Sequence, residues 1–211
     1  MYNKKKGGFM KTRIEQQFDF ILEIDKEKQI KRETLCTNKT QLEDDAQHAW
    51  HMSIMALLLK EYASEEIDIL KTISMLLIHD IVEIDAGDTY AYDEIAIQSQ
   101  ADREEKAANR LFGLLPEDQR YKFIDLFHEF EDGISPEARF AKALDNIQPM
   151  MLNAATDGKK WKEHQVKLSQ ILKRNQNTDQ TSPVLWNYTY QNFIEPHIEL
   201  GNIQEDIKKA E

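Results

Sequence analysis

The chain has 211 residues, of which 38 are acidic and 27 basic, and its formal net charge is -11 at pH 7. This length suits one well-buried core, and the acidic balance argues against a nucleic-acid polymer as a partner. Cys36 is the only cysteine, which excludes an intramolecular disulfide and predicts a reducing, cytoplasmic location. No apolar stretch reaches membrane-spanning length, so we also expect no membrane partner.

The low numbers of glycine and proline, 7 and 5, are typical of a helical protein. We therefore predict an all-α fold, a single compact bundle of about six to eight helices. It should occupy residues 13–205 and follow a flexible N-terminal segment, residues 1–12. Apolar periodicity and capping signals place the helices at about 14–30, 45–62, 65–80, 101–112, 116–132, from 136 onward and from 183 onward.

Individual residues mark the expected helix boundaries. Asp44 or Asp45 should cap the second helix, and Ser64 the third. Gly87 interrupts the helical pattern, so residues 83–92 are expected to form a loop or a short irregular turn.

A proline marks the helix that starts at residue 136. Pro149 removes the hydrogen bond to the carbonyl of Asp145, four residues before it. We therefore expect this helix to bend or end at the proline.

Three polar side chains, those of His48, Asp80 and Asp145, fall where helical periodicity predicts buried apolar positions. His79 precedes Asp80, and adjacent helix residues point about 100° apart, so both could reach one ion at the helix rim. A buried charge must be paired or bound to a metal. Imidazole and carboxylate ligands from separate helices suit a divalent cation such as zinc, manganese, iron or cobalt. A buried polar network without a metal is the alternative.

The three segments that carry these residues, 43–51, 77–90 and 140–149, have a fixed order and spacing. With them the chain resembles the HD-domain metal-dependent phosphohydrolases, in particular the branch related to bacterial 5′-deoxynucleotidases, over about residues 18 to 195. The resemblance implies the HD-domain helical fold and a homodimer. It also implies one divalent metal ion (Mn, Co, Zn, Fe or Mg), with the ligands His48, His79, Asp80 and Asp145.

The same resemblance implies roles for three further residues. It assigns Glu83 as the catalytic acid or base and Asp88 as a second acid that contacts water or the substrate sugar. Arg32 corresponds to an arginine that contacts substrate, with Lys31 and Lys39 as competing candidates. Arginine suits this role because it forms paired hydrogen bonds to phosphate.

The predicted reaction is the hydrolysis of nucleoside 5′-monophosphates, above all deoxyribonucleoside 5′-monophosphates, to nucleoside and phosphate. Two alternatives stay open: an HD hydrolase of another ester, such as a cyclic nucleotide or guanosine tetraphosphate, and a non-catalytic metal-binding helical scaffold. Glu83 and Asp88 argue against the scaffold. The chain departs from the family pattern at Gln47 and Ala49, where glutamate and serine are usual. The change at Gln47 could alter the hydrogen bonds around the metal ligands.

Three aromatic side chains near these segments have weaker signals. His51 lies one turn after His48, and we interpret it as facing the ligands or the substrate, with a core role as the alternative. Trp50 and Trp161 are interpreted as packing residues rather than platforms for a base.

Overall fold

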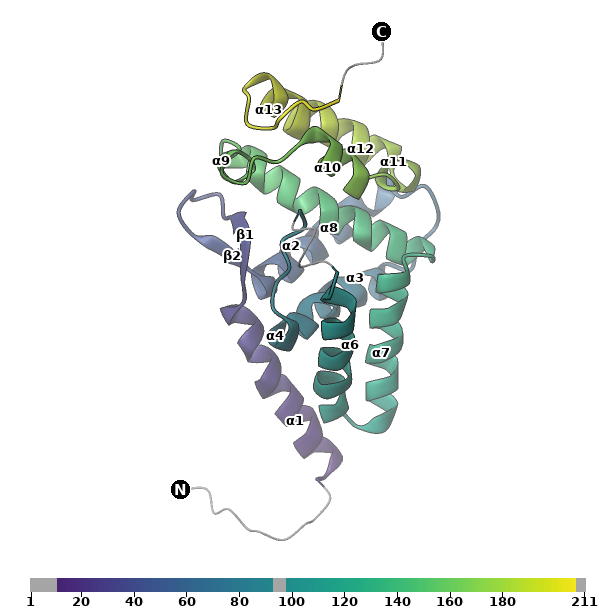
Figure 1. Cartoon of the computed structure of the whole chain (residues 1–211). Coiled ribbons are helices and arrows are strands. Elements are labelled where there is room, and N and C mark those ends of the chain that lie inside the picture. Colours follow the sequence, from purple (N-terminus) through teal and green to yellow (C-terminus); the bar gives the residue numbers. More distant parts are fainter. Residues whose placement is uncertain (1–10, 93–97, 208–211) are drawn as a thin grey trace.

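The protein is almost entirely helical in a computed structural model that describes residues 11–92 and 98–207. A long central helix, α8, separates a group of short helices near the C-terminus from the longer helices α1, α6 and α7 (Figure 1). The helices in chain order are α1 (Arg13–Ile24), α2 (Asp45–Leu59), α3 (Ile69–Ile78), α4 (Glu83–Ala86), α6 (Gln100–Leu111), α7 (Glu117–Asp132), α8 (Pro136–Ala155), α9 (Lys159–Glu163), α10 (Leu168–Arg174), α11 (Thr178–Thr181), α12 (Pro183–Thr189) and α13 (Glu195–Glu199).

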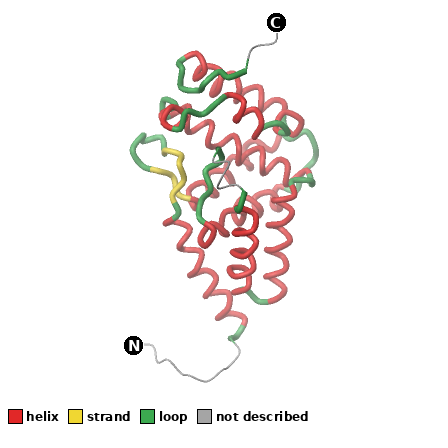
Figure 2. The backbone as a smooth tube through the Cα atoms, in the orientation of Figure 1, coloured by secondary structure: helices red, strands yellow, loops and turns green. Residues whose placement is uncertain are grey.

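The all-α prediction is confirmed, although the described residues contain more helices than expected. Several of these helices are short, because α4 and α11 have four residues each and α9 and α13 have five. The sequence did not predict the antiparallel hairpin of β1 (Lys31–Leu35) and β2 (Leu42–Asp44), which Figure 2 shows as the strand element of the fold. None of the described helices combines the length and apolar character needed to cross a membrane.

The N-terminal expectations lie partly outside the described residues. Of the segment 1–12, which we expected to be flexible, residues 1–10 are not described. Thr12 caps α1 through the backbone N–H of Glu15. The first helix is shorter than predicted, because a 3-10 turn over Asp25–Gln29 follows α1 and leads into β1.

The caps of the next two helices were predicted with different success. Asp44 caps α2: its carboxylate accepts a hydrogen bond from the Gln47 backbone N–H, and the Asp44 backbone N–H donates to the side-chain oxygen of Gln47. The prediction of Ser64 as the cap of α3 was wrong. Asp68 has this position, because its carboxylate accepts from two backbone N–H groups and also complements the positive end of the helix dipole.

Pro149 does not end α8, which continues to Ala155. Met150 and Leu152, just beyond the proline, are buried, and their packing favours the helix over the single hydrogen bond that proline removes. The Asn153 side-chain amide also donates to the Pro149 carbonyl, at 2.8 Å. Of the two expected outcomes, a bend or an end, the end at Pro149 was wrong, and tertiary packing explains the difference.

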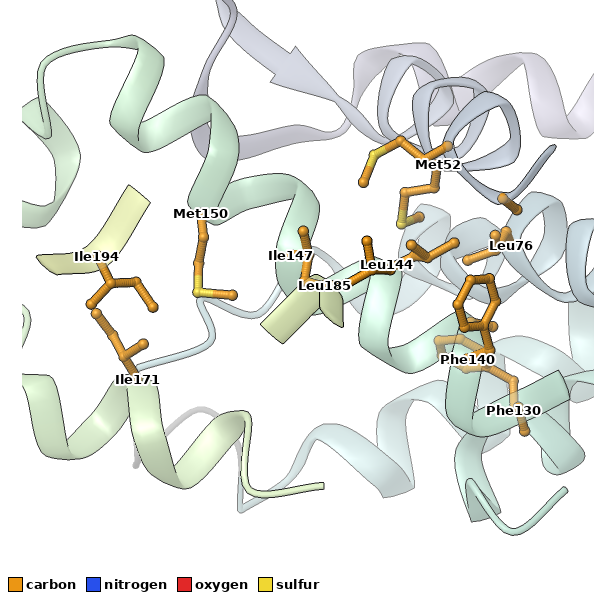
Figure 3. Packing of buried hydrophobic residues seen from close by; sticks show 14 of the residues in the cluster. Met52, Leu76, Phe130, Phe140, Leu144, Ile147, Met150, Ile171, Leu185 and Ile194 are labelled. Atoms are coloured by element: carbon orange, nitrogen blue, oxygen red, sulfur yellow. The ribbon is translucent and has the colours of Figure 1, made fainter. Parts of the chain in front are cut away.

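The main core lies around α8. Phe140, Leu144 and Ile147 of this helix pack with Met52 of α2 and Leu76 of α3, all buried (Figure 3). A second buried cluster joins α1, α6, α7 and the turn after α3. The turn after α3 contains the His79-Asp80 dipeptide, so the candidate ligands lie where these two clusters meet α8.

Candidate metal centre and substrate cavity

Four side chains from three segments converge beside α8. His48 comes from α2, His79 and Asp80 from the 3-10 turn that continues α3, and Asp145 from the middle of α8. His48 Nε2 is 3.1 Å from Asp145 Oδ1 and 4.0 Å from Asp80 Oδ2. His79 Nε2 is 3.0 Å from Asp80 Oδ1 and 3.9 Å from Asp145 Oδ1. The structure thus brings together all four residues that the sequence singled out as ligands.

The spacing of these atoms suits a single ion. For an ion about 2.1 Å from each ligand atom, two ligand atoms are about 3.0 Å apart at 90° and about 4.2 Å apart at 180°. The four distances above fall in this range. In addition, the buried His79 Nε2 has no hydrogen-bond partner among the described residues, although it faces two carboxylates. An orphaned imidazole nitrogen of this kind fits a metal ligand.

Hydrogen bonds orient both imidazole rings. His79 Nδ1 donates to the backbone carbonyl of Leu76, at 3.2 Å, so Nε2 is the atom that faces the carboxylates. His48 Nδ1 is 2.9 Å from Gln148 Oε1, and its Nε2 likewise faces Asp145. Metal-binding histidines commonly have their second nitrogen held in this manner.

The charges of the four residues compensate one another. Burial opposes the imidazolium form of His79, but the carboxylates of Asp80 and Asp145 together outweigh burial and raise the pKa of His79 to about 10. Burial also opposes ionisation of Asp80, yet the positive charges of His79 and Arg32 lower the pKa of Asp80. Burial opposes ionisation of Asp145 as well, but the neighbouring His48 and His79 side chains lower its pKa. A divalent cation would replace the imidazolium protons as the partner of these carboxylates.

A second group of acids adjoins the first through Asp80. Asp45, Asp80 and Glu83 each present an oxygen within 4.8 Å of the others, and all three are buried. Arg32 Nη1 donates to Asp80 Oδ2 at 2.7 Å and to Asp45 Oδ1 at 3.2 Å. Burial, and then the negative charge of Asp80 and Asp45, raise the pKa of Glu83 strongly. These effects favour the protonated form of Glu83, which lies at the start of α4.

A cavity of about 270 Å³ opens beside this cluster, between β1, the loop 88–92 and helices α8, α9 and α10. Its size is at the small end of the range for ligand pockets. His48 lies beneath the cavity and is fully buried. The other candidates from the sequence line it: Arg32, His79, Asp80, Glu83, Asp88 and Asp145.

Of the three cations considered from the sequence, only Arg32 lines the cavity. Lys31 is 3.1 Å from Asp44, and Lys39 is 2.6 Å from Asp157 on the surface. Both lysine side chains are about half exposed. Arg32, by contrast, points to the buried carboxylates.

Sequence reasoning missed other cations of the cavity wall. Lys142 and Arg174 also line it, and Arg174 Nη2 is 3.5 Å from Asp145 Oδ2. Lys142 could have been found, because it lies three residues before Asp145 and hence on the same face of the helix. Arg174 gave no such signal, since it lies in a polar segment with no candidate ligand nearby in sequence.

The aromatic side chains differ in their environments. His51 Nδ1 is 3.1 Å from Gln148 Nε2, so it contacts the hydrogen-bond partner of His48 rather than the core. Trp161 is buried and packs as predicted, with 2% of its surface exposed. The prediction for Trp50 was wrong, since its side chain is 63% exposed on the outer face of α2. The neighbours Ile54, Leu57 and Leu58 extend this apolar face, which helical periodicity alone does not distinguish from a core.

Residues 24–186 match the HD domain family, and the chain therefore belongs to that family. This match confirms the resemblance inferred from the sequence. The chain is also similar to a solved structure described as a predicted metal-dependent phosphohydrolase from Magnetospirillum magnetotacticum MS-1, with a TM-score of 0.87 and 43% sequence identity. The alignment covers 93% of this chain and 98% of that chain.

Curated relatives match the chain less completely. The 5′-deoxynucleotidase HDDC2 of Homo sapiens is 33% identical over 113 residues, which is 54% of this chain and 53% of that protein. The 5′-deoxynucleotidase HDDC2 of Dictyostelium discoideum is 32% identical over 117 residues, which is 53% of this chain and 61% of that protein. The matched part spans about half the length of these relatives.

Proposed function

We propose that the protein is a metal-dependent phosphohydrolase that converts nucleoside 5′-monophosphates, above all deoxyribonucleoside 5′-monophosphates, to nucleoside and phosphate. One observation carries this proposal: His48, His79, Asp80 and Asp145 converge at a cavity that cations and acids also line. The relatives named 5′-deoxynucleotidase support the substrate class.

The donor set fits a divalent ion held by His48, His79, Asp80 and Asp145. Such an ion, when bound, supplies a Lewis acid for a phosphoryl oxygen and lowers the pKa of a water molecule. Two imidazoles and two carboxylates suit manganese, cobalt, zinc or iron. Magnesium is a further candidate.

The remaining residues of the cavity would bind and protonate the substrate. Arg32 and Arg174 donate hydrogen bonds to the phosphate, because both guanidinium groups already lie beside the ligand carboxylates. Glu83 donates its proton to the departing 5′ oxygen, since burial and its acidic neighbours keep it protonated. Asp88 faces the same cavity and contacts the sugar or the attacking water.

A phosphate-release panel tests the substrate class. Ribo- and deoxyribonucleoside 5′-monophosphates, a cyclic nucleotide, guanosine tetraphosphate and p-nitrophenyl phosphate are each assayed with manganese, cobalt, zinc and magnesium. We expect the highest kcat/KM for deoxyribonucleoside 5′-monophosphates. Hydrolysis of the cyclic nucleotide or the tetraphosphate alone would refute this assignment, and no hydrolysis with any metal would favour the non-catalytic scaffold.

Two substitutions separate metal binding from proton transfer. Asp80→Ala should abolish metal binding and activity together. Glu83→Gln keeps the size and polarity of the side chain but removes the proton, so the metal content should persist while kcat falls about 10²- to 10⁴-fold. A near-normal kcat in Glu83→Gln would move the proton-transfer role to Asp88.

Arg32 is tested against a matched cation outside the cavity. Arg32→Ala should lower kcat/KM for nucleotides. The loss should correspond to about 1.5–3 kcal/mol of transition-state stabilisation, the range for a charged hydrogen bond. Lys39→Ala, which removes a surface cation, should leave kcat/KM unchanged. An equal loss on p-nitrophenyl phosphate indicates a phosphate contact, and no loss on either substrate excludes Arg32 from the site.

We also propose a homodimer through the outer face of α2. Trp50, Ile54, Leu57 and Leu58 are exposed there, while the opposite face of the same helix is buried. A helix that is apolar on both faces needs a second partner, and a two-fold axis lets one such face cover its own copy. Light scattering should give twice the chain mass, and Trp50→Glu should give a monomer. A monomeric wild-type protein would refute the dimer.

A cytoplasmic location is likewise a proposal. It is supported by the single cysteine, Cys36, which favours a reducing compartment. Fractionation of the host cell with an antibody against the protein tests it, and recovery in a membrane or extracellular fraction would refute it.

A further inference from the structure

A chain of buried hydrogen bonds leads away from His48 on the side opposite the cavity. Gln148 of α8 is fully buried, and its amide lies between His48 and Glu43 of β2, which is 3% exposed. Gln148 Oε1 is 2.9 Å from His48 Nδ1, and Gln148 Nε2 donates to Glu43 Oε1 at 2.6 Å. Burial of three polar side chains raises the free energy of the folded state unless each side chain forms hydrogen bonds.

The direction of each hydrogen bond in this chain follows from Glu43. A carboxylate oxygen accepts hydrogen bonds, so the nitrogen of the Gln148 amide must face Glu43. The amide oxygen must then face His48, and an amide oxygen only accepts. His48 Nδ1 therefore carries the hydrogen in this bond, and Nε2 is the nitrogen left for the ligand cluster, 3.1 Å from Asp145 Oδ1.

Two further contacts reinforce this arrangement. Glu43 Oε2 lies 3.5 Å from His48 Nδ1, close enough for electrostatic attraction, and has no hydrogen-bond partner among the described residues. The second N–H of the Gln148 amide faces His51 Nδ1, at 3.1 Å, and can donate to it when the His51 hydrogen is on Nε2. A flipped amide would place its oxygen against the Glu43 carboxylate and lose the hydrogen bond to Glu43.

We infer that Glu43 and Gln148 are positioning residues that fix the tautomer and orientation of His48 and thereby raise the metal affinity of the site. The inference rests on the proposed function, because it takes His48 as a metal ligand. Glu43 is then the buried carboxylate that supports the ligand histidine through Gln148. The residue directly before that histidine is Gln47, which has no carboxylate.

Titration with Co²⁺ of the whole, metal-free protein tests this inference. Gln148→Leu removes both hydrogen bonds at similar size, and Glu43→Gln removes the group that sets the direction of the amide. We expect both variants to bind Co²⁺ about 10- to 100-fold more weakly than wild type, the range for partners of metal ligands. The control is Ser53→Ala, which removes another buried hydrogen bond of α2 and should bind Co²⁺ as wild type does.

A second measurement reports the tautomer directly. In Zn²⁺-loaded wild-type protein, long-range ¹H–¹⁵N spectra should show hydrogen on Nδ1 of His48 and none on Nε2. Coordination of Zn²⁺ through Nδ1 would overturn the inference whether or not the variants fold. Circular dichroism and the Tm of each metal-free variant report folding.

The outcomes separate this inference from the proposed function. Wild-type protein that binds no Co²⁺ refutes the metal-dependent function, and this inference with it. Wild-type protein that binds Co²⁺ while folded Gln148→Leu and Glu43→Gln bind it equally well refutes only the positioning role. A lower Tm with unchanged Co²⁺ affinity would likewise reduce the network to a structural one.

Discussion

Glu27 gives the sharpest test of the electrostatics beside the site. This residue of the 3-10 turn after α1 is 7% exposed, and its Oε1 has no hydrogen-bond partner among the described residues. Burial, and then the charges of Asp80 and Asp45, raise the pKa of Glu27 from 4.5 to about 7. The folded state thus binds this proton more tightly than the unfolded state does.

The sign and size of the effect follow from this difference in pKa. A raised folded-state pKa contributes stability that is fully present below pH 4.5 and is lost as the pH rises through about 7. At about 1.36 kcal/mol per pKa unit, the loss is at most roughly 3 kcal/mol. Glu27→Gln cannot ionise, so it should be more stable than wild type by about 1–3 kcal/mol at pH 8 and nearly equal to it at pH 4.5.

Urea unfolding at pH 4.5, 6, 7 and 8, followed by circular dichroism, measures these differences. A chelator is included, because a bound cation would offset the charge of Asp80. The matched control is Glu66→Gln, at an exposed glutamate before α3, which should leave the pH dependence of unfolding unchanged. The reasoning fails if Glu27→Gln and wild type lose stability in parallel from pH 4.5 to pH 8.

Three further predictions concern packing, metal and phosphate. Gly158→Ala should lower the free energy of unfolding by about 1–3 kcal/mol, because the φ of Gly158 is +65° and a Cβ would lie 2.6 Å from His197 Nδ1. The control is Gly201→Ala, at φ +69° with open space around it. This variant should lower the free energy of unfolding by less in the same urea assay. Saturating Mn²⁺ should raise the free energy of unfolding, by about 2.7 kcal/mol at 100 times Kd, and a His79→Ala variant with the same stabilisation would contradict the ligand set. Inorganic phosphate should increase the affinity for Mn²⁺ measured by calorimetry, and Arg174→Ala should make this increase smaller. Equal Mn²⁺ affinity with and without phosphate would contradict this prediction.

The sequence singled out the side chains that converge at the candidate metal centre because a polar or charged residue in an apolar stripe is visible from the sequence alone. His48, Asp80 and Asp145 each interrupt a helical apolar pattern, and the three helices that carry them pack on one another. Glu83 was assigned its role through the family resemblance, and it lies one helical turn beyond His79. These signals depend on local periodicity, which the fold preserves.

Other features depend on contacts between distant segments, and the sequence could not reveal them. The β1–β2 hairpin was missed because its strands have five and three residues and no alternating apolar pattern. Arg174 reaches Asp145 only through the packing of α10 beside α8. Trp50 was interpreted as a packing residue, but periodicity shows which residues share a helix face and not whether that face is covered.

An acidic protein, with a net charge of -11, can still bind the proposed phosphate substrate, because cationic side chains line the cavity. In this structure acidic side chains pair with these cations. Arg32 lies 2.7 Å from Asp80, and Arg174 lies 3.5 Å from Asp145. While these carboxylates balance the guanidinium groups, the wall offers little free positive charge to an anion. If Asp80 and Asp145 held a divalent cation, as proposed, both arginines would lose their counter-charge and be available as donors for phosphate. Metal and phosphate should therefore bind cooperatively, which is the physical basis of the coupling predicted above.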